Sequence, residues 1–193
     1  MTQLLFLAGS ARKESLNKKL AGYAANVATK LDGVAAQFID LKDFSMPIYD
    51  GDHEAADGLP DAAIALKKLF QQSHGIFIAS PEYNSSFSPL LKNALDWISR
   101  PHEKNEAPLV AYRGKVFALA AVSPGALGGL RGLVPLRMML GNVGAWVSPN
   151  QVAVGGGGQA FDAEGKMIDD KQAGMIKQLV ADLAQAARQL SSP

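Results

Sequence analysis

A short stretch between the first apolar segment and the first helix-like segment concentrates small and polar residues. It reads Gly-Ser-Ala-Arg-Lys-Glu-Ser-Leu-Asn, from Gly9 to Asn17. Hydroxyl, amide and guanidinium groups are donors suited to phosphate oxygens, and glycine allows a close backbone approach. Ser15 is placed to cap a helix that starts at Leu16, whose free N–H groups favour an anion. The order of these residues indicates a terminal-phosphate site, although a surface turn with a serine cap is the alternative.

A second polar stretch, SPEYNSSFSPLLKNALDW, begins at Ser80. Pro81 stiffens a loop that leaves a strand, and Ser88 or Pro89 opens the next helix. A polar loop with one aromatic ring and exposed backbone groups can bind the edge of a planar heterocycle and cover it. The residues suited to this are Glu82, Tyr83 and Asn84. The alternative is a plain connection in which the tyrosine packs on the core.

A third stretch, VSPGALGGLRGLVPLR, contains Ser123, Gly125, Gly128 and Gly129. Glycines at this density let the backbone approach a flat ligand or another subunit. Flexible turn chemistry is an equally good interpretation of this segment.

Apolar runs and helix-period stretches alternate along the chain. We expect strands over Leu4–Ala8, Val34–Ile39, Gly75–Ala79, Val116–Val122 and Gln151–Val154. We expect helices over Leu16–Leu31, Pro60–Gln72, Pro89–Ser99, Leu127–Leu140 and Gln172–Leu190. Strict alternation predicts an α/β fold, a doubly wound parallel sheet with helices on both faces. Ligands bind such a sheet at the carboxyl ends of its strands, where the three polar stretches lie.

The chain shows no linker, repeat or low-complexity tract, so we expect one domain over residues 1–193. The segment Lys42–Leu59 is too polar for the core and too long for a simple connection. It is either a flap or a disordered loop.

Composition disfavours several classes of function. A net charge of +1 and a pI near 7.9 do not indicate the excess of basic residues that is typical of nucleic-acid-binding proteins. The chain has no cysteine, which rules out disulfides and thiolate metal sites and agrees with a reducing compartment. We expect a cytoplasmic protein without membrane contact, because no leader and no apolar run of about 20 residues is present. No metal site is expected, since His53, His74 and His102 lack ligand spacing.

The polar stretches together resemble those of a known family. Gly9 to Asn17, the tetrapeptide PEYN, LKNALDW and GALGGLR are similar, in order and spacing, to the NADPH-dependent FMN reductases. This flavodoxin-like group includes bacterial quinone, azo-dye and chromate reductases, and the resemblance covers nearly the whole chain. It implies a five-stranded parallel sheet in the order 2-1-3-4-5, with FMN at the carboxyl edge. It also implies homodimers, often paired into homotetramers.

The resemblance carries site residues with it. The FMN phosphate would be held by Ser10, Arg12, Ser15, Leu16 and Asn17, and the isoalloxazine by Pro81, Glu82, Tyr83 and Asn84. Ser123 and Gly125 would belong to the same site, although VSPG departs from the more serine-rich form often seen there.

The mechanism implied by the cofactor needs no catalytic side chain. FMN takes a hydride at N5 from NADPH or NADH and passes electrons to an acceptor that later occupies the same face, which implies ping-pong kinetics. The acceptors would be quinones, azo compounds, chromate or free flavin. The main alternative is a flavin-binding electron-transfer protein with a protein redox partner, which needs an acidic docking face that a near-neutral chain lacks. A flavin-free structural or regulatory domain is a third interpretation.

Arg100 follows the helix Pro89–Ser99, which starts at the flavin edge and leads away from it, so Arg100 cannot reach the flavin of its own chain. We expect this helix to form a homodimer interface, because it is richer in apolar residues than one sheet contact needs. These residues are Leu90, Leu91, Ala94, Leu95, Trp97 and Ile98. Arg100 of one subunit would then approach the other subunit's flavin, in the substrate pocket where anionic acceptors dock. The alternative is an arginine that interacts with the dipole of its own helix.

Overall fold

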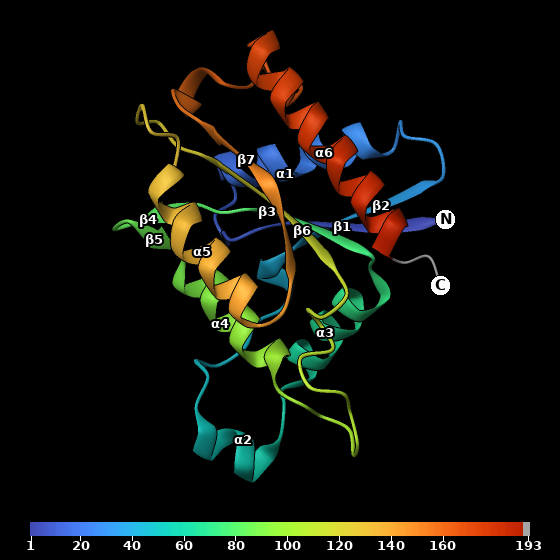
Figure 1. The fold of residues 1–193 in the computed structure, drawn as a ribbon. Helices are drawn as coiled ribbons and strands as arrows, with labels where there is room; N and C mark the ends of the chain where they lie inside the picture. The colour runs from blue at the N-terminus through green and yellow to red at the C-terminus, as the bar shows by residue number, and fades with distance from the viewer. Residues whose placement is uncertain (191–193) are drawn as a thin grey trace.

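Five parallel strands form the central sheet in the computed structural model, which describes residues 1–190 (Figure 1). The strands are β1 (Thr2–Ala8), β2 (Val34–Asp40), β3 (Gly75–Ala79), β6 (Val116–Val122) and β7 (Trp146–Val154). They lie in the order β2-β1-β3-β6-β7, which is the predicted 2-1-3-4-5 when only these strands are counted. The predicted flavodoxin-like topology is therefore confirmed.

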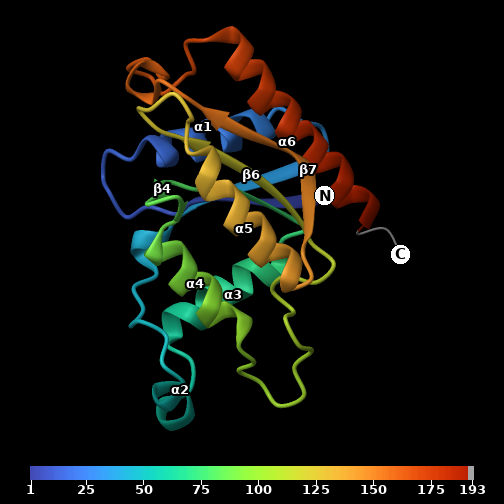
Figure 2. The ribbon, with the colours of Figure 1, turned by 60° about the vertical axis from the view of Figure 1, so that its left-hand side comes forward.

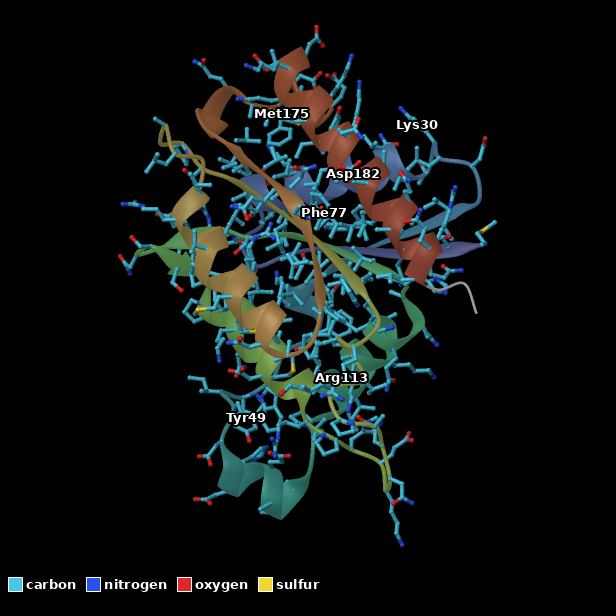
Figure 3. All side chains as sticks on the ribbon, in the orientation of Figure 1. Lys30, Tyr49, Phe77, Arg113, Met175 and Asp182 are labelled. Carbon is cyan, nitrogen blue, oxygen red and sulfur yellow. The ribbon has the colours of Figure 1, made fainter. Side chains whose placement is uncertain are left out.

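Helices cover both faces of the sheet (Figures 1 and 2). One face carries α1 (Leu16–Ala28) and α6 (Asp170–Leu190), and the other carries α3 (Asp61–Gln72), α4 (Pro89–Ser99) and α5 (Leu130–Asn142). Strands β3 and β6 are buried along their whole length, which is why their sequences are unbroken apolar runs. Phe77 lies near the middle of the sheet (Figure 3). Within residues 1–190, no helix combines the length and apolarity needed to cross a membrane.

Several element boundaries differ from the expected ones: α1 ends at Ala28 rather than Leu31, and two others, at α5 and β7, have an identifiable cause. Helix α5 begins at Leu130 rather than Leu127, because Gly128 and Gly129 adopt positive φ angles of 61° and 90° that a helix excludes. Strand β7 begins at Trp146, before the expected range, and contains Pro149. An edge strand tolerates proline, here beside a register shift against β6.

The loop after β3 folds into a short hairpin that the sequence did not predict. Strands β4 (Glu82–Tyr83) and β5 (Ser86–Phe87) pair antiparallel. The two turn residues, Asn84 and Ser85, both have positive φ angles, 51° and 64°, as a tight two-residue hairpin turn requires. The hairpin projects from the carboxyl edge of the sheet beside α5 (Figure 1).

The segment between β2 and α3 is an ordered flap, which we define as residues 44–58. It follows the 3₁₀ turn η1 (Leu41–Asp43) and contains α2 (Gly51–Asp57), which lies beyond α3 and α4 (Figures 1 and 2). The flap is attached to α4 through the Pro47 carbonyl, which accepts hydrogen bonds from Trp97 Nε1 and Asn93 Nδ2, both at 2.8 Å. Of the two interpretations of this segment, the flap is the one observed.

Helix α4 is richer in apolar residues than its sheet contact needs, as expected, but a second element of the same chain covers the remainder. Its large apolar residues are buried within one chain, with only Leu90 partly exposed; the buried ones are Leu91, Ala94, Leu95, Trp97 and Ile98. The flap covers the outer side, because the rings of Tyr49 and His53 pack edge-on against Trp97 with centroids 5.0 and 5.9 Å away. Figure 3 shows Tyr49 between α2 and α4. The apolar composition of α4 is thus used inside the chain and gives no support to a subunit interface there.

Candidate functional site

Four loops meet at the carboxyl edge of the sheet. They follow β1 (residues 9–15), β3 (80–88), β6 (123–129) and β7 (155–158). The first two are joined by Ser88 Oγ, which donates to the Gly9 carbonyl at 2.6 Å, and the last two by the Gly157 N–H, which donates to the Ser123 carbonyl at 2.9 Å. The three polar stretches singled out in the sequence therefore lie side by side.

The loop after β1 contains hydrogen-bond donors that have no acceptor within residues 1–190. Within the part of the chain that the structure describes, the backbone N–H groups of residues 13–17 bind no protein atom. Ser10 and Ser15 are buried, and their Oγ atoms accept the N–H groups of Arg12 at 3.3 Å and Lys18 at 3.4 Å. Each hydroxyl keeps its own proton for a further acceptor.

Arg12 lies on the exposed rim of this loop. Its guanidinium binds no carboxylate or carbonyl among residues 1–190. Free N–H groups at the start of α1, two buried hydroxyls and an unengaged guanidinium form a donor set that fits a terminal phosphate. Leu16, the first residue of α1, contributes its N–H to this set.

Asn17 takes a different position from the one expected of a phosphate ligand. Its side chain is buried, and both ends of the amide bind Val122 at the end of β6. Nδ2 donates to the Val122 carbonyl at 3.0 Å, and the Val122 N–H donates to Oδ1 at 3.1 Å. The amide therefore joins α1 to β6, and the backbone N–H is the group of Asn17 that faces outward as a donor.

Gly9 also serves packing in this structure. A Cβ at this position would lie 3.0 Å from Leu91 Cβ and 3.2 Å from Ser88 Oγ. The space that the glycine leaves is filled by the first turn of α4, so the close approach it allows is to a helix of the same chain.

The hairpin β4–β5 carries the expected heterocycle-binding residues into solvent. Tyr83 is 45% exposed, which contradicts the interpretation that it packs on the core, and Asn84 lies beside it at the turn. Pro81, just before the hairpin, is buried. An exposed ring and the free backbone groups of a turn are suited to cover and bind a planar ligand.

The carboxylate of Glu82 binds α5. Oε1 accepts from Arg131 Nε at 2.9 Å and Nη2 at 2.8 Å, and Oε2 accepts from the Gly132 N–H at 3.1 Å. Glu82 thus anchors the hairpin on the first turn of α5, a role the sequence analysis did not assign. Arg131 was missed altogether, and an arginine beside the glycines of GGLRG was the available signal.

The glycines after β6 are packed against the loop after β7. A Cβ on Gly128 would lie 2.5 Å from the Val154 carbonyl carbon, and one on Gly155 would lie 2.5 Å from the Ala126 oxygen. Ser123 and Gly125 lie in the first of these loops, and the Ser123 Oγ lies 3.7 Å from the position of a Cβ on Gly125. The glycine run after β7, which the sequence analysis passed over, is therefore part of the same edge.

Arg100 lies at the opposite end of α4 from the candidate site, roughly 16 Å along an eleven-residue helix. Its Nε lies 2.9 Å from both carboxylate oxygens of Glu54 in the flap, and its guanidinium lies 6.0 Å from the centre of the Tyr49 ring. Burial raises the pKa of Glu54, but the hydrogen bonds from Tyr49 and Arg100 outweigh it, and the pKa is lowered. Within one chain, Arg100 holds the flap and does not reach the carboxyl edge.

The comparison with known proteins decides the family. The sequence profile described as NADPH-dependent FMN reductase matches residues 2–159, which include all four loops. The chain belongs to this family. The family resemblance inferred from the polar stretches is thereby confirmed. The expected cofactor, FMN, and the expected co-substrate, a reduced nicotinamide, are confirmed with it.

The names of similar proteins are consistent with membership of the NADPH-dependent FMN reductase family. The chain is 30% identical to the NAD(P)H-dependent FMN reductase of Pseudomonas aeruginosa over 189 residues, 97% of this chain and 96% of that one. It is 34% identical to a quinone reductase of Escherichia coli over 155 residues, 80% and 77% of the two chains. The flavoenzyme FerB, an NAD(P)H:acceptor oxidoreductase of Paracoccus denitrificans, superposes with a TM-score of 0.81 at 28% identity and 98% coverage of each chain.

Proposed function

We propose that this reductase transfers electrons from NADPH or NADH through FMN to quinones or related acceptors such as azo compounds, chromate or free flavin. The observation that carries the proposal is one sheet edge that presents two matched surfaces. The loop 10–17 offers donors without protein acceptors, and the neighbouring hairpin offers an exposed aromatic ring. The donor groups of the loop suit the phosphate of FMN, and the exposed aromatic ring of the hairpin suits its isoalloxazine ring.

The residues divide the binding between side chains and backbone. Arg12, Ser10 and Ser15 supply charge and hydroxyl protons to the phosphate, while Leu16 and Asn17 supply backbone N–H groups. Such a site favours a terminal phosphate, so FMN binds better than FAD.

On the other half of the site, Tyr83 and Asn84 of the hairpin cover and bind the ring system. Pro81 stiffens the entry to the hairpin and Glu82 fixes its position on α5. Ser123 and Gly125 close the opposite side of the edge with backbone and one hydroxyl.

When bound, FMN supplies a ring position that accepts a hydride from a nicotinamide and returns the electrons to an acceptor. The chain's own part is to orient the ring and leave one face open. Both substrates then need the same face, so nicotinamide leaves before the acceptor enters, which is a ping-pong order. No acid, base or nucleophile of the protein is required at this face.

The proposal also includes the oligomeric state, the cellular location and the role of Arg100. The family resemblance favours a homodimer, with pairs of dimers as a further assembly, in the cytoplasm. Arg100 of a second copy near the flavin stays a prediction, and its pair with Glu54 is a competing role in the same chain.

The test begins with the absorbance spectrum of the purified protein. We expect flavin bands, or their appearance when apo-protein is titrated with FMN, then loss of the bands on anaerobic addition of NADPH and recovery on addition of a quinone. Parallel double-reciprocal plots establish the ping-pong order, and intersecting plots exclude it. A protein that takes up no FMN refutes the proposal, and one that is reduced but turns over no small acceptor is instead an electron carrier.

A further inference from the structure

Helices α1 and α6 pack side by side on one face of the sheet and leave a groove between them (Figures 1 and 2). The groove has a volume of about 980 Å³, at the upper end of the range for ligand-binding clefts. Its apolar lining consists of Tyr23, Val27, Leu31 and Ala181, all of them partly exposed. Of the described residues that line it, none belongs to the four loops of the candidate site. The groove is therefore a second concave surface, separate from the flavin edge.

Two glycines inside these helices widen the groove. Gly22 of α1 and Gly174 of α6 both line it, and a Cβ placed on either glycine would stand in open space. Alanine would fit at both positions and is a much better helix former, so packing within the described chain explains neither glycine. Without side chains at these two positions, an occupant can approach the backbones of both helices closely.

Lysines border the groove along its length. Lys19 lies in the first turn of α1, Lys30 just beyond its last turn, Lys166 in the loop before α6 and Lys177 on α6. All four residues are exposed, and none forms an ion pair within residues 1–190 (Figure 3 shows Lys30). Glu164 is the one acidic residue among the described lining residues. The rim of the groove thus carries an excess of unpaired positive charge.

Tyr23 adds a hydrogen-bond donor to the apolar lining. Its hydroxyl forms no hydrogen bond with residues 1–190. Burial and, to a smaller extent, the negative charge of Asp170 raise the pKa of Tyr23, so the hydroxyl keeps its proton at neutral pH. A protonated phenol among apolar side chains suits an occupant that carries an acceptor at the edge of its apolar face.

The placement of the lysines distinguishes between anionic occupants. Lys19 and Lys30 are eleven residues apart, which is about 16 Å along a helix, and Lys166 and Lys177 come from the α6 side. Charges spread in this way match an occupant with several carboxylates, whereas a fatty acid has a single carboxylate at one end. An anionic membrane is flat on this scale and cannot reach the lining of a groove between two helices. An amphipathic helix with acidic flanks meets both conditions.

We propose that this groove binds an amphipathic helix of a partner protein, with acidic residues along both flanks of its apolar face. The apolar face packs on Tyr23, Val27 and Leu31, and the acidic flanks pair with the lysines of the rim. The hairpin β4–β5 contacts α5 on the opposite face of the sheet, so the bound helix leaves the hairpin accessible. The inference does not rest on the proposed function, because it concerns how another protein holds the reductase and not what the reductase reduces.

The probe is a fluorescein-labelled synthetic helix of about 18 residues, longer than the roughly 12–15 residues below which isolated helices are marginal. It carries leucine on one face and glutamate on both flanks, and fluorescence anisotropy reports its binding to the purified protein. We expect saturable binding that weakens about tenfold or more when lysine replaces the glutamates of the probe. Raising the salt from about 0.05 M to about 0.5 M should weaken binding about fivefold or more, since salt screens exposed charges.

The first pair of variants changes charge only. Lys19→Glu combined with Lys30→Glu reverses two rim charges, and Lys68→Glu combined with Lys104→Glu is the matched control with the same change in net charge. Lys68 and Lys104 are exposed and lie outside the groove. The rim variant should bind the acidic helix more weakly by about tenfold or more, and the control should bind it like the wild type.

The second pair of variants changes shape. Gly174→Leu places a side chain in the groove, and Gly141→Leu adds one on α5, where a Cβ also stands in open space. Leucine favours a helix over glycine, so both variants should fold and should unfold at no lower urea concentration than the wild type. We expect Gly174→Leu to weaken binding about tenfold or more and Gly141→Leu to leave it unchanged. This pair decides the question if the lysine variant fails to fold.

The results that overturn the proposal are equally definite. A wild type that binds no acidic helix, equal binding of the acidic and basic helices, or equal affinities of Gly174→Leu and Gly141→Leu each exclude a charge-matched helix site in this groove. Binding of palmitate or of phosphatidylglycerol vesicles that is lost in Gly174→Leu, without binding of the helix, would assign the groove to an anionic amphiphile or a membrane instead.

Discussion

Replacing Asn17 by alanine removes the group that completes strand β6. Strand β3 ends at Ala79, and its last hydrogen bond to β6 joins the Ser80 N–H to the Ala120 carbonyl at 2.8 Å. The chain then turns away through Pro81, so β6 extends beyond its neighbour. The peptide groups of Val122 are satisfied by the Asn17 amide in place of a strand.

The cost of the substitution follows from those two bonds. Val122 is 2% exposed, so its N–H and C=O lose their partner in a site closed to bulk water. Leaving a buried donor or acceptor unsatisfied costs about 1–3 kcal/mol, so the loss of both bonds in Asn17→Ala lowers the free energy of unfolding by about 2–6 kcal/mol. That is a large part of the roughly 5–15 kcal/mol that stabilises a domain.

Urea unfolding of the apo-protein measures this effect. The midpoint should fall while the dependence of unfolding free energy on urea stays constant. Asn26→Ala is the matched control, because Asn26 is exposed on the same helix and its replacement should change stability by less than about 0.5 kcal/mol. The affinity for FMN should change little, since the backbone N–H at position 17 remains.

The opposite pattern would contradict this reasoning. A loss of stability below about 1 kcal/mol, together with a tenfold or greater loss of FMN affinity, would show that the amide binds phosphate and only secondarily supports β6.

Further expectations concern three charged residues. Arg12→Ala should weaken FMN binding by about 1.5–3 kcal/mol without changing stability, and titration of the apo-protein with unchanged affinity would make Arg12 a surface residue only. Glu106→Gln leaves the ammonium of Lys67, 1% exposed, without its anion and should lower the free energy of unfolding by about 3–5 kcal/mol. Burial raises the pKa of Glu106, but the hydrogen bonds from Lys67 and the His102 N–H, together with the nearby charge of Lys67, outweigh it and the pKa is lowered. The stabilisation is therefore complete above the ordinary value of 4.5 and disappears as the pH falls through the lowered pKa, so urea unfolding against pH should show this acid loss in the wild type and not in the variant. Arg100→Ala should reduce turnover of an anionic acceptor more than that of a neutral quinone, in a salt-dependent manner, whereas equal loss would leave Arg100 only as the partner of Glu54.

The central strands could be predicted because burial on both faces leaves a direct pattern in the sequence. GIFIA and VFALAAV are continuous apolar runs, and both are strands with the predicted bounds. The first half of β7 could not be predicted, since an edge strand is partly solvated and admits Pro149. The conformation of the flap could not be predicted from the local sequence either. It is held by contacts such as the hydrogen bond between Pro47 and Trp97, which are fifty residues apart.

The meeting of the polar loops at one sheet edge could be predicted from the sequence, but the orientation of their side chains could not. Glycine, serine and arginine at strand ends indicate a ligand edge whatever each side chain touches. Whether a polar side chain faces the ligand or the protein depends on neighbours from other elements. Glu82 faces α5 because Arg131 and the Gly132 N–H are there, and Asn17 faces β6 because β3 ends early. Neither circumstance is visible in the local sequence.

The contact of Gly128 with Val154 and of Gly155 with Ala126 limits where this enzyme can be redesigned. Any side chain at either glycine collides with backbone 2.5 Å away, so the loops after β6 and β7 accept no new chemistry at those positions. Tyr83 at the hairpin has no such restriction, because its side chain is exposed, whereas the positive φ angles of Asn84 and Ser85 limit the residues that fit at the turn itself. A mutational library aimed at new electron acceptors therefore gains most by varying position 83 while keeping both glycines fixed.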